Sequence, residues 1–87
     1  MNITQQKEFK KELKQIFSGY SSWTPKIERR MTSLGFIVKN NKGKHVVVQW
    51  SDNTNKNYLF TISKTPSDKR AGLNNVGIIC RALLSRQ

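Results

Sequence analysis

The strongest constraint on the fold is the run His45-Val46-Val47-Val48-Gln49-Trp50, the most strand-like part of the chain. β-Branched and aromatic residues favour strands, and successive strand side chains point to opposite faces of a sheet. The alternation therefore predicts that Val46, Val48 and Trp50 face the interior, with Trp50 packed in the core. The other set of side chains begins with His45, the only histidine of the chain, which is expected on the open face.

Two more segments, residues 36–39 and 58–63, share this composition, and polar turn-forming residues separate all three. The residues before His45 predict a tight hairpin in which Gly43 takes the positive φ of a bulge, and residues 51–57 predict a longer loop. Together the segments predict a three-stranded antiparallel meander.

Helical periodicity precedes the meander in residues 4–17, where apolar side chains recur at i, i+4, i+7 and i+8. Thr4 is the expected N-cap and Gly19 the stop. Lysines and glutamates cover the other faces. Such a basic helix can touch RNA or lipid, but a solvated face is the commoner case. We expect Tyr20 and Trp23, in the connector that follows, to hold this helix against the body.

Two further helices flank the strands. Thr24-Pro25 predicts the start of one that ends at Gly35, because Pro suits the first helical position and Gly the C-terminal end. After a polar loop over residues 64–72, apolar spacing predicts a last helix that begins near Asn74 or Asn75.

This order predicts an α+β fold with two layers, α-β-β-β-α, as in double-stranded RNA-binding domains, preceded by an additional N-terminal helix. Residues 1–23 form the additional helix and its connector, and residues 24–87 the α-β-β-β-α part. A chain of 87 residues is expected to make one compact domain overall.

The charge balance indicates a polyanionic partner. The chain has 16 Lys and Arg against 5 Asp and Glu, for a formal net charge of +11. Nucleic acid is the leading candidate, because cations gain affinity by releasing counterions from phosphates. A membrane is disfavoured because the sequence has neither a long apolar run nor a signal-peptide core, so a cytoplasmic location is the default expectation.

The chain's single cysteine, Cys80, allows no intramolecular disulfide and no cysteine cluster for zinc. It is expected to be a small core residue. One histidine and scattered acidic residues make no recognisable metal-ligand set. We therefore expect any reaction to run without a metal or a small-molecule cofactor.

Three features in this order resemble the HicA family of toxin–antitoxin ribonucleases, mRNA interferases on a fold like that of double-stranded RNA-binding domains. They are Leu34-Gly35-Phe36 at a helix-to-strand junction, Gly43-Lys44-His45 at the second strand, and the final helix over residues 73–83. The resemblance implies that His45 is catalytic, that mRNA is cleaved and translation arrested, and that a HicB-like antitoxin covers the site. The chain departs from the family pattern at Lys44, where serine is common.

Metal-independent RNA cleavage by the ribose 2′-hydroxyl needs a proton acceptor, a proton donor and positive charge at the phosphate. His45 can fill one proton-transfer role at a time, and imidazole suits that role near neutral pH. The candidate phosphate contacts are Lys42 and Lys44 beside the Gly43 turn, Lys64 at the end of the third strand, and Arg29 and Arg30 on the second helix.

Two other functions fit the same charge and fold. One is a non-catalytic RNA-binding module, in which His45 is an ordinary half-exposed strand residue. The other is a basic subunit whose main ligand is an acidic protein.

Overall fold

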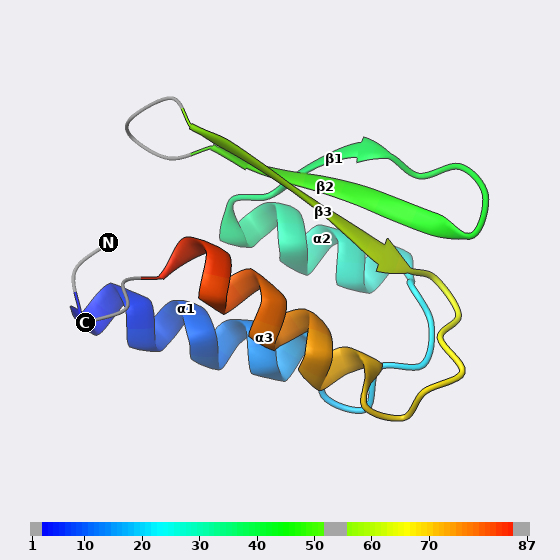
Figure 1. Cartoon of the computed structure of the whole chain (residues 1–87), viewed down its shortest axis with the longest axis horizontal. Helices are drawn as coiled ribbons and strands as arrows, with labels where there is room; N and C mark the ends of the chain where they lie inside the picture. The colour runs from blue at the N-terminus through cyan, green and yellow to red at the C-terminus, as the bar shows by residue number, and fades with distance from the viewer. Residues whose placement is uncertain (1–2, 52–55, 85–87) are drawn as a thin grey trace.

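Three helices lie on one side of a three-stranded antiparallel sheet in the computed structural model, which describes residues 3–51 and 56–84 (Figure 1). The prediction of an α+β fold is confirmed. The elements follow in the order α1 (Ile3–Ile16), α2 (Pro25–Leu34), β1 (Ile37–Asn40), β2 (His45–Ser51), β3 (Asn57–Ser63) and α3 (Ala71–Leu83). Residues 52–55 of the predicted polar loop lie outside the described residues.

The sheet has the strand order β1-β2-β3, as a meander requires. Val46 and Val48 are fully buried, and they face Ile62 and Phe60 across the β2–β3 pair. His45 at the start of β2 is exposed. The predicted alternation is therefore confirmed, because the β2–β3 pairing runs without a break from His45 to Ser51 and keeps one set of side chains against the helices.

The predicted hairpin turn, the start of α2 and the glycines predicted to end the first two helices are confirmed. Gly43 has φ 78°, and Gly19 and Gly35, with φ 64° and φ 124°, follow the ends of α1 and α2. At the start of α2, the Thr24 hydroxyl accepts a hydrogen bond from the Ile27 amide at 3.2 Å.

The predicted start of α1 is wrong. The helix begins at Ile3, so Thr4 lies inside it and is not the N-cap. Ile3 itself is exposed, and the apolar spacing that predicted the helix begins only at Phe9. The apolar pattern therefore marks the buried face but not the helix end.

The start of α3 is also earlier than predicted, at Ala71 and not near Asn74 or Asn75. The N-cap, Arg70, makes no side-chain capping hydrogen bond, so the usual sequence signal for a helix start is missing. Asp68 organises the turn before the helix by accepting from the Arg70 amide at 2.8 Å and from the Ala71 amide at 3.1 Å. The first turn of α3 also packs on the rest of the chain, since Gly72 is buried.

An aromatic cluster joins α1 to the sheet. The Phe9 and Phe36 rings each lie 5.0 Å from the Trp50 ring, measured between centroids. Trp50 packs against the core as predicted, but its side chain is only half-buried. Because Phe9 belongs to α1 and Trp50 to β2, α1 shares one hydrophobic core with the α-β-β-β-α part.

The connector after α1 is tied to the end of β3. The Tyr20 hydroxyl donates to the Ser63 carbonyl oxygen at 2.6 Å, and the Trp23 amide donates to the Lys64 carbonyl oxygen at 2.8 Å. The Tyr20 ring also stacks edge-on against Phe17 at 5.2 Å. Tyr20 thus joins the end of the first helix to β3, as predicted, whereas Trp23 ties the connector to Lys64.

Candidate functional site

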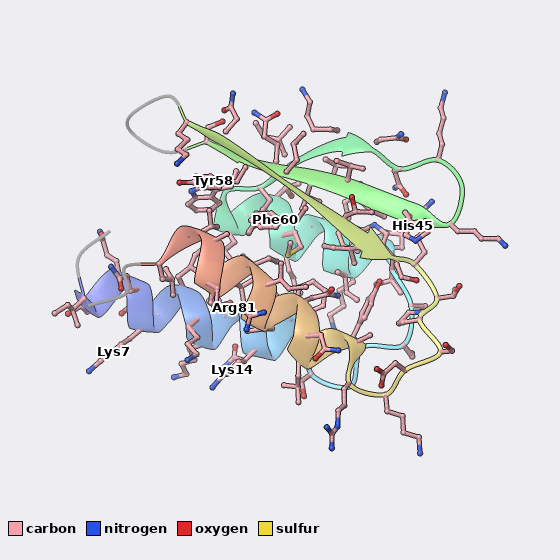
Figure 2. The ribbon with its side chains drawn as sticks, in the orientation of Figure 1. Lys7, Lys14, His45, Tyr58, Phe60 and Arg81 are labelled. Atoms are coloured by element: carbon pink, nitrogen blue, oxygen red, sulfur yellow. The ribbon has the colours of Figure 1, made fainter. Side chains whose placement is uncertain are left out.

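His45 lies at one end of the sheet, where β2 begins and β3 ends (Figure 2). Its strand partner across the β2–β3 pair is Ser63, and the Gly43 turn immediately precedes it. Within residues 3–51 and 56–84, the imidazole has no hydrogen-bond partner. It is therefore free to meet a ligand, but the protein does not fix the orientation of its ring.

Lysines from two segments meet at this end of the sheet. The Lys64 amide donates to the Lys44 carbonyl oxygen at 2.9 Å, which extends the β2–β3 ladder by one step past His45. The Lys64 ammonium group donates to the Asn41 carbonyl oxygen at 2.8 Å and so closes the β1–β2 hairpin against β3. Lys42 lies in the same hairpin. We call Lys42, Gly43, Lys44, His45 and Lys64 the histidine end.

The hairpin that carries Lys42 and Lys44 has its own local support. The Asn40 side-chain oxygen accepts from the Lys42 amide at 3.0 Å, as asparagine commonly does in turns. Gly43 then takes a positive φ at no steric cost, because it has no Cβ. The turn therefore holds the backbone on both sides of Gly43 while both lysine side chains remain exposed.

Glu28 is a residue of this region that the sequence analysis missed. One of its carboxylate oxygens accepts from the Asn41 side-chain amide at 2.9 Å and from the Trp23 indole N–H at 3.3 Å. Glu28 thus joins the first turns of α2 to the hairpin and to the connector. A glutamate near a helix start is ordinary in sequence, and no local pattern pairs it with an asparagine thirteen residues later.

Arg29 and Arg30, the remaining predicted phosphate contacts, are not part of the histidine end. Arg30 lies 4.0 Å from the Glu12 carboxylate of α1, and both arginines line a groove between α1 and α2 with Ser33 and Leu34. The structure therefore groups the three lysines with His45 and places the two arginines against α1.

Cys80 is only half-buried, packed against the edge of the core. Burial raises the pKa of its thiol, and the nearby ammonium groups of Lys10 and Lys14 act in the opposite direction. A structural role fits this thiol, because the neutral form is favoured by burial. Among the described residues, no three His, Cys, Asp or Glu side chains come together as metal ligands would.

The chain matches no family model, no curated protein and no solved structure among those with which it was compared. None of the helices in the described ranges is long and apolar enough to cross a membrane.

Proposed function

We propose that this protein is a HicA-like ribonuclease of the cytoplasm, a toxin that cleaves mRNA without a metal and is neutralised by a HicB-like antitoxin. The observation that carries the proposal is the exposed imidazole of His45 beside Lys42, Lys44 and Lys64. The order α2-β1-β2-β3-α3 supports it, because double-stranded RNA-binding domains have the same order of elements.

In the proposed reaction, the ribose 2′-oxygen attacks the adjacent phosphorus, so that a P–O2′ bond forms and the P–O5′ bond breaks. His45 accepts the proton of the 2′-hydroxyl group, and water protonates the leaving 5′-oxygen. His45 then returns its proton to the hydroxide that remains. The products are a 2′,3′-cyclic phosphate and a free 5′-hydroxyl group.

The lysines have an electrostatic part in this scheme, because negative charge grows on the phosphate oxygens during attack. Lys64 is suited to it: its ammonium group has three N–H donors and uses one on the Asn41 carbonyl oxygen. That hydrogen bond holds the charge at the hairpin while two donors remain for a phosphate. Lys44 is held beside Lys64 by the backbone hydrogen bond between them.

The rate that such a site can reach is limited. Positioned acid–base catalysis contributes about 10²- to 10⁴-fold, and His45 is the one histidine available. His45→Ala is therefore expected to lower the cleavage rate about 10²- to 10⁴-fold. A slow enzyme is sufficient for growth arrest if each cleavage removes a message.

The test is incubation of purified protein with end-labelled RNA in EDTA. The wild type is expected to give fragments with cyclic phosphate ends, and His45→Ala is expected to give almost none. Thr61→Ala is the matched control, because Thr61 is exposed on β3 and faces Val47 two pairs along from the His45–Ser63 pair. Equal cleavage by His45→Ala and Thr61→Ala, both shown to be folded, would refute the catalytic role of His45.

The second candidate is a non-catalytic RNA-binding module. The specific observation that favours it is the imidazole without a hydrogen-bond partner in the described ranges, since catalytic histidines are commonly oriented by a partner. It predicts salt-dependent RNA binding without fragments and no effect of His45→Ala. Expression of the wild type and of His45→Ala in growing cells separates the candidates further. If the protein is a catalytic toxin, the wild type should arrest growth and His45→Ala should not.

The third candidate function is that of a basic subunit whose main ligand is an acidic protein, and purification with its partners tests it. Co-purification of an acidic protein that abolishes RNA cleavage would identify it as the antitoxin. An acidic partner with no effect on RNA would make protein binding the main function.

A further inference from the structure

We infer that α1 carries a second RNA contact, separate from the histidine end, that holds the phosphate backbone through Lys7, Lys10, Lys11 and Lys14. We call these four residues the lysine row. The inference rests on the proposal that RNA is the ligand, but it does not require His45 to be catalytic. It assigns a role to the N-terminal helix that precedes the α-β-β-β-α part.

The spacing of the lysine row is helical. Its members stand at i, i+3, i+4 and i+7, so their side chains leave the helix on the same side and extend over about 10 Å of its axis. All four are exposed, and with Gln15 and Ser18 they line one shallow depression of the surface. The row is therefore a continuous strip of positive charge.

The acidic residues of α1 lie on a different side of the helix. Glu8 and Glu12 are four residues apart, and Glu12 faces α2, where it approaches Arg30 to 4.0 Å. No member of the lysine row forms an ion pair with any residue in the described ranges. The charge of the row is consequently available to a ligand.

Arg81 of α3 is a further exposed cation on the helical layer. Its guanidinium group lies over Gly77, with Nη1 only 3.3 Å from the place a Cβ of residue 77 would take. The residue before it, Cys80, lies near Lys10 and Lys14, whose charges act to lower the pKa of its thiol, and α3 packs against α1. Figure 2 shows Lys7, Lys14 and Arg81 on the helical layer and His45 at the far end of the sheet.

The chemistry of the row favours RNA over other polyanions. The apolar face of α1, with Phe9, Leu13 and Ile16, is buried in the core, so it cannot enter a lipid surface as the apolar face of a membrane-bound amphipathic helix does. The residues that line the depression with the row, Gln15 and Ser18, are polar, so the depression lacks the aromatic or aliphatic side chains that anchor protein interfaces. Regularly spaced cations without apolar anchors match a phosphate backbone.

The test measures binding of a labelled RNA hairpin of about 20 base pairs, somewhat longer than the roughly 16 that a double-stranded RNA-binding domain spans. The full chain carries His45→Ala, so that no cleavage complicates the measurement. In this background, Lys7→Gln, Lys10→Gln and Lys14→Gln are combined as the row variant. The control variant combines Lys26→Gln, Lys39→Gln and Lys69→Gln, three exposed lysines from other segments. Both variants have net charge +8 in place of +11, and circular dichroism checks that both are folded.

The expected result is a difference in salt dependence. Each phosphate contact contributes about 0.7 to 0.9 to the slope of log K against log salt concentration, so the row variant should lose about 2 to 3 from the magnitude of that slope. The control variant should lose less than about 1. Equal slopes in the two variants, or no RNA binding by the parent protein, would overturn the inference.

Two further readouts separate this inference from the proposed function. If the row variant keeps the salt dependence of RNA binding and the wild type shows cleavage that depends on His45, the second contact is refuted and the proposed ribonuclease function stands. If the row variant loses salt dependence and the wild type does not cleave RNA, the second contact is supported and the proposed ribonuclease function is refuted. Vesicles of phosphatidylserine and phosphatidylcholine test the rival ligand: binding to them that depends on the row, with RNA binding that does not, would overturn the inference in favour of a membrane surface.

Discussion

Gly72 near the start of α3 offers the sharpest test of how α1 and α3 pack. By helix propensity alone, Gly72→Ala should stabilise the protein by about 1 kcal/mol, because alanine is the better helix former. The structure predicts the opposite. A Cβ at residue 72 would lie well inside van der Waals contact of the Phe17 carbonyl oxygen and 3.1 Å from the Tyr20 Cβ.

The size of the effect follows from what must move. The obstructing Phe17 oxygen belongs to the backbone, so the clash is relieved only if α3 moves away from the end of α1. Overpacking of this kind costs typically about 1 to 3 kcal/mol. After the gain of about 1 kcal/mol in helix propensity is subtracted, a net loss of up to about 2 kcal/mol in the free energy of unfolding is expected.

Gly77→Ala in the same helix is the matched control. Its Cβ would meet only the end of the flexible Arg81 side chain, at 3.3 Å, which can move aside. This variant should gain up to about 1 kcal/mol. The pair therefore isolates the tertiary contact, because both substitutions make the same chemical change in one helix.

Urea unfolding followed by circular dichroism measures both variants. With a slope of about 1 kcal/mol/M for a small domain, Gly72→Ala should lower the midpoint by up to about 2 M and Gly77→Ala should raise it by up to about 1 M. If Gly72→Ala were as stable as Gly77→Ala, α3 would not lie against the end of α1 and the described packing would be wrong.

Two other predictions concern single hydrogen bonds. Tyr20→Phe removes the 2.6 Å hydrogen bond to the Ser63 carbonyl oxygen and should cost about 1 kcal/mol in urea unfolding at pH 7; an unchanged midpoint would contradict that bond. Burial raises the pKa of the Tyr20 phenol, so the folded state holds this proton more tightly than the unfolded state. The wild type should therefore lose stability as pH rises above about 10, and Tyr20→Phe should lack that part of the loss. Equal losses in the two proteins would contradict the burial of the phenol. Thr24→Ala removes the cap of α2 and should cost about 1 kcal/mol in thermal unfolding. Thr4→Ala, inside α1, should cost nothing measurable. Similar losses in the two variants would show that Thr24 does not act as a cap.

The site was predictable where it depends on neighbours in sequence. The Gly43 turn and the strand alternation placed His45 on the open face beside Lys42 and Lys44, because each of these features depends on a few consecutive residues. Lys64 joined them as expected, since the end of a third strand in a meander returns to the start of the second. Arg29 and Arg30 were not predictable in this way, because the direction in which α2 packs against α1 decides where they point.

The start of α3 shows a different limit. Sequence rules identify a helix start by a capping side chain, and Arg70 makes no such hydrogen bond. The first turn of α3 instead packs on α1, where Gly72 allows a close approach to Phe17. That contact joins residues more than fifty positions apart, so no local pattern reveals it.

The sequence by itself determined the order of helices and strands, the face that each strand buries and the high positive charge, because periodicity, turn chemistry and composition are local properties of the chain. Only the tertiary structure decided that α1 shares the core of the α-β-β-β-α part through Phe9 and Trp50. It also decided that Glu28 braces the hairpin beside His45 and that the lysine row, within residues 3–51 and 56–84, is exposed without an ion pair. These outcomes depend on how elements pack on one another, and packing selects among faces that a sequence pattern leaves equivalent.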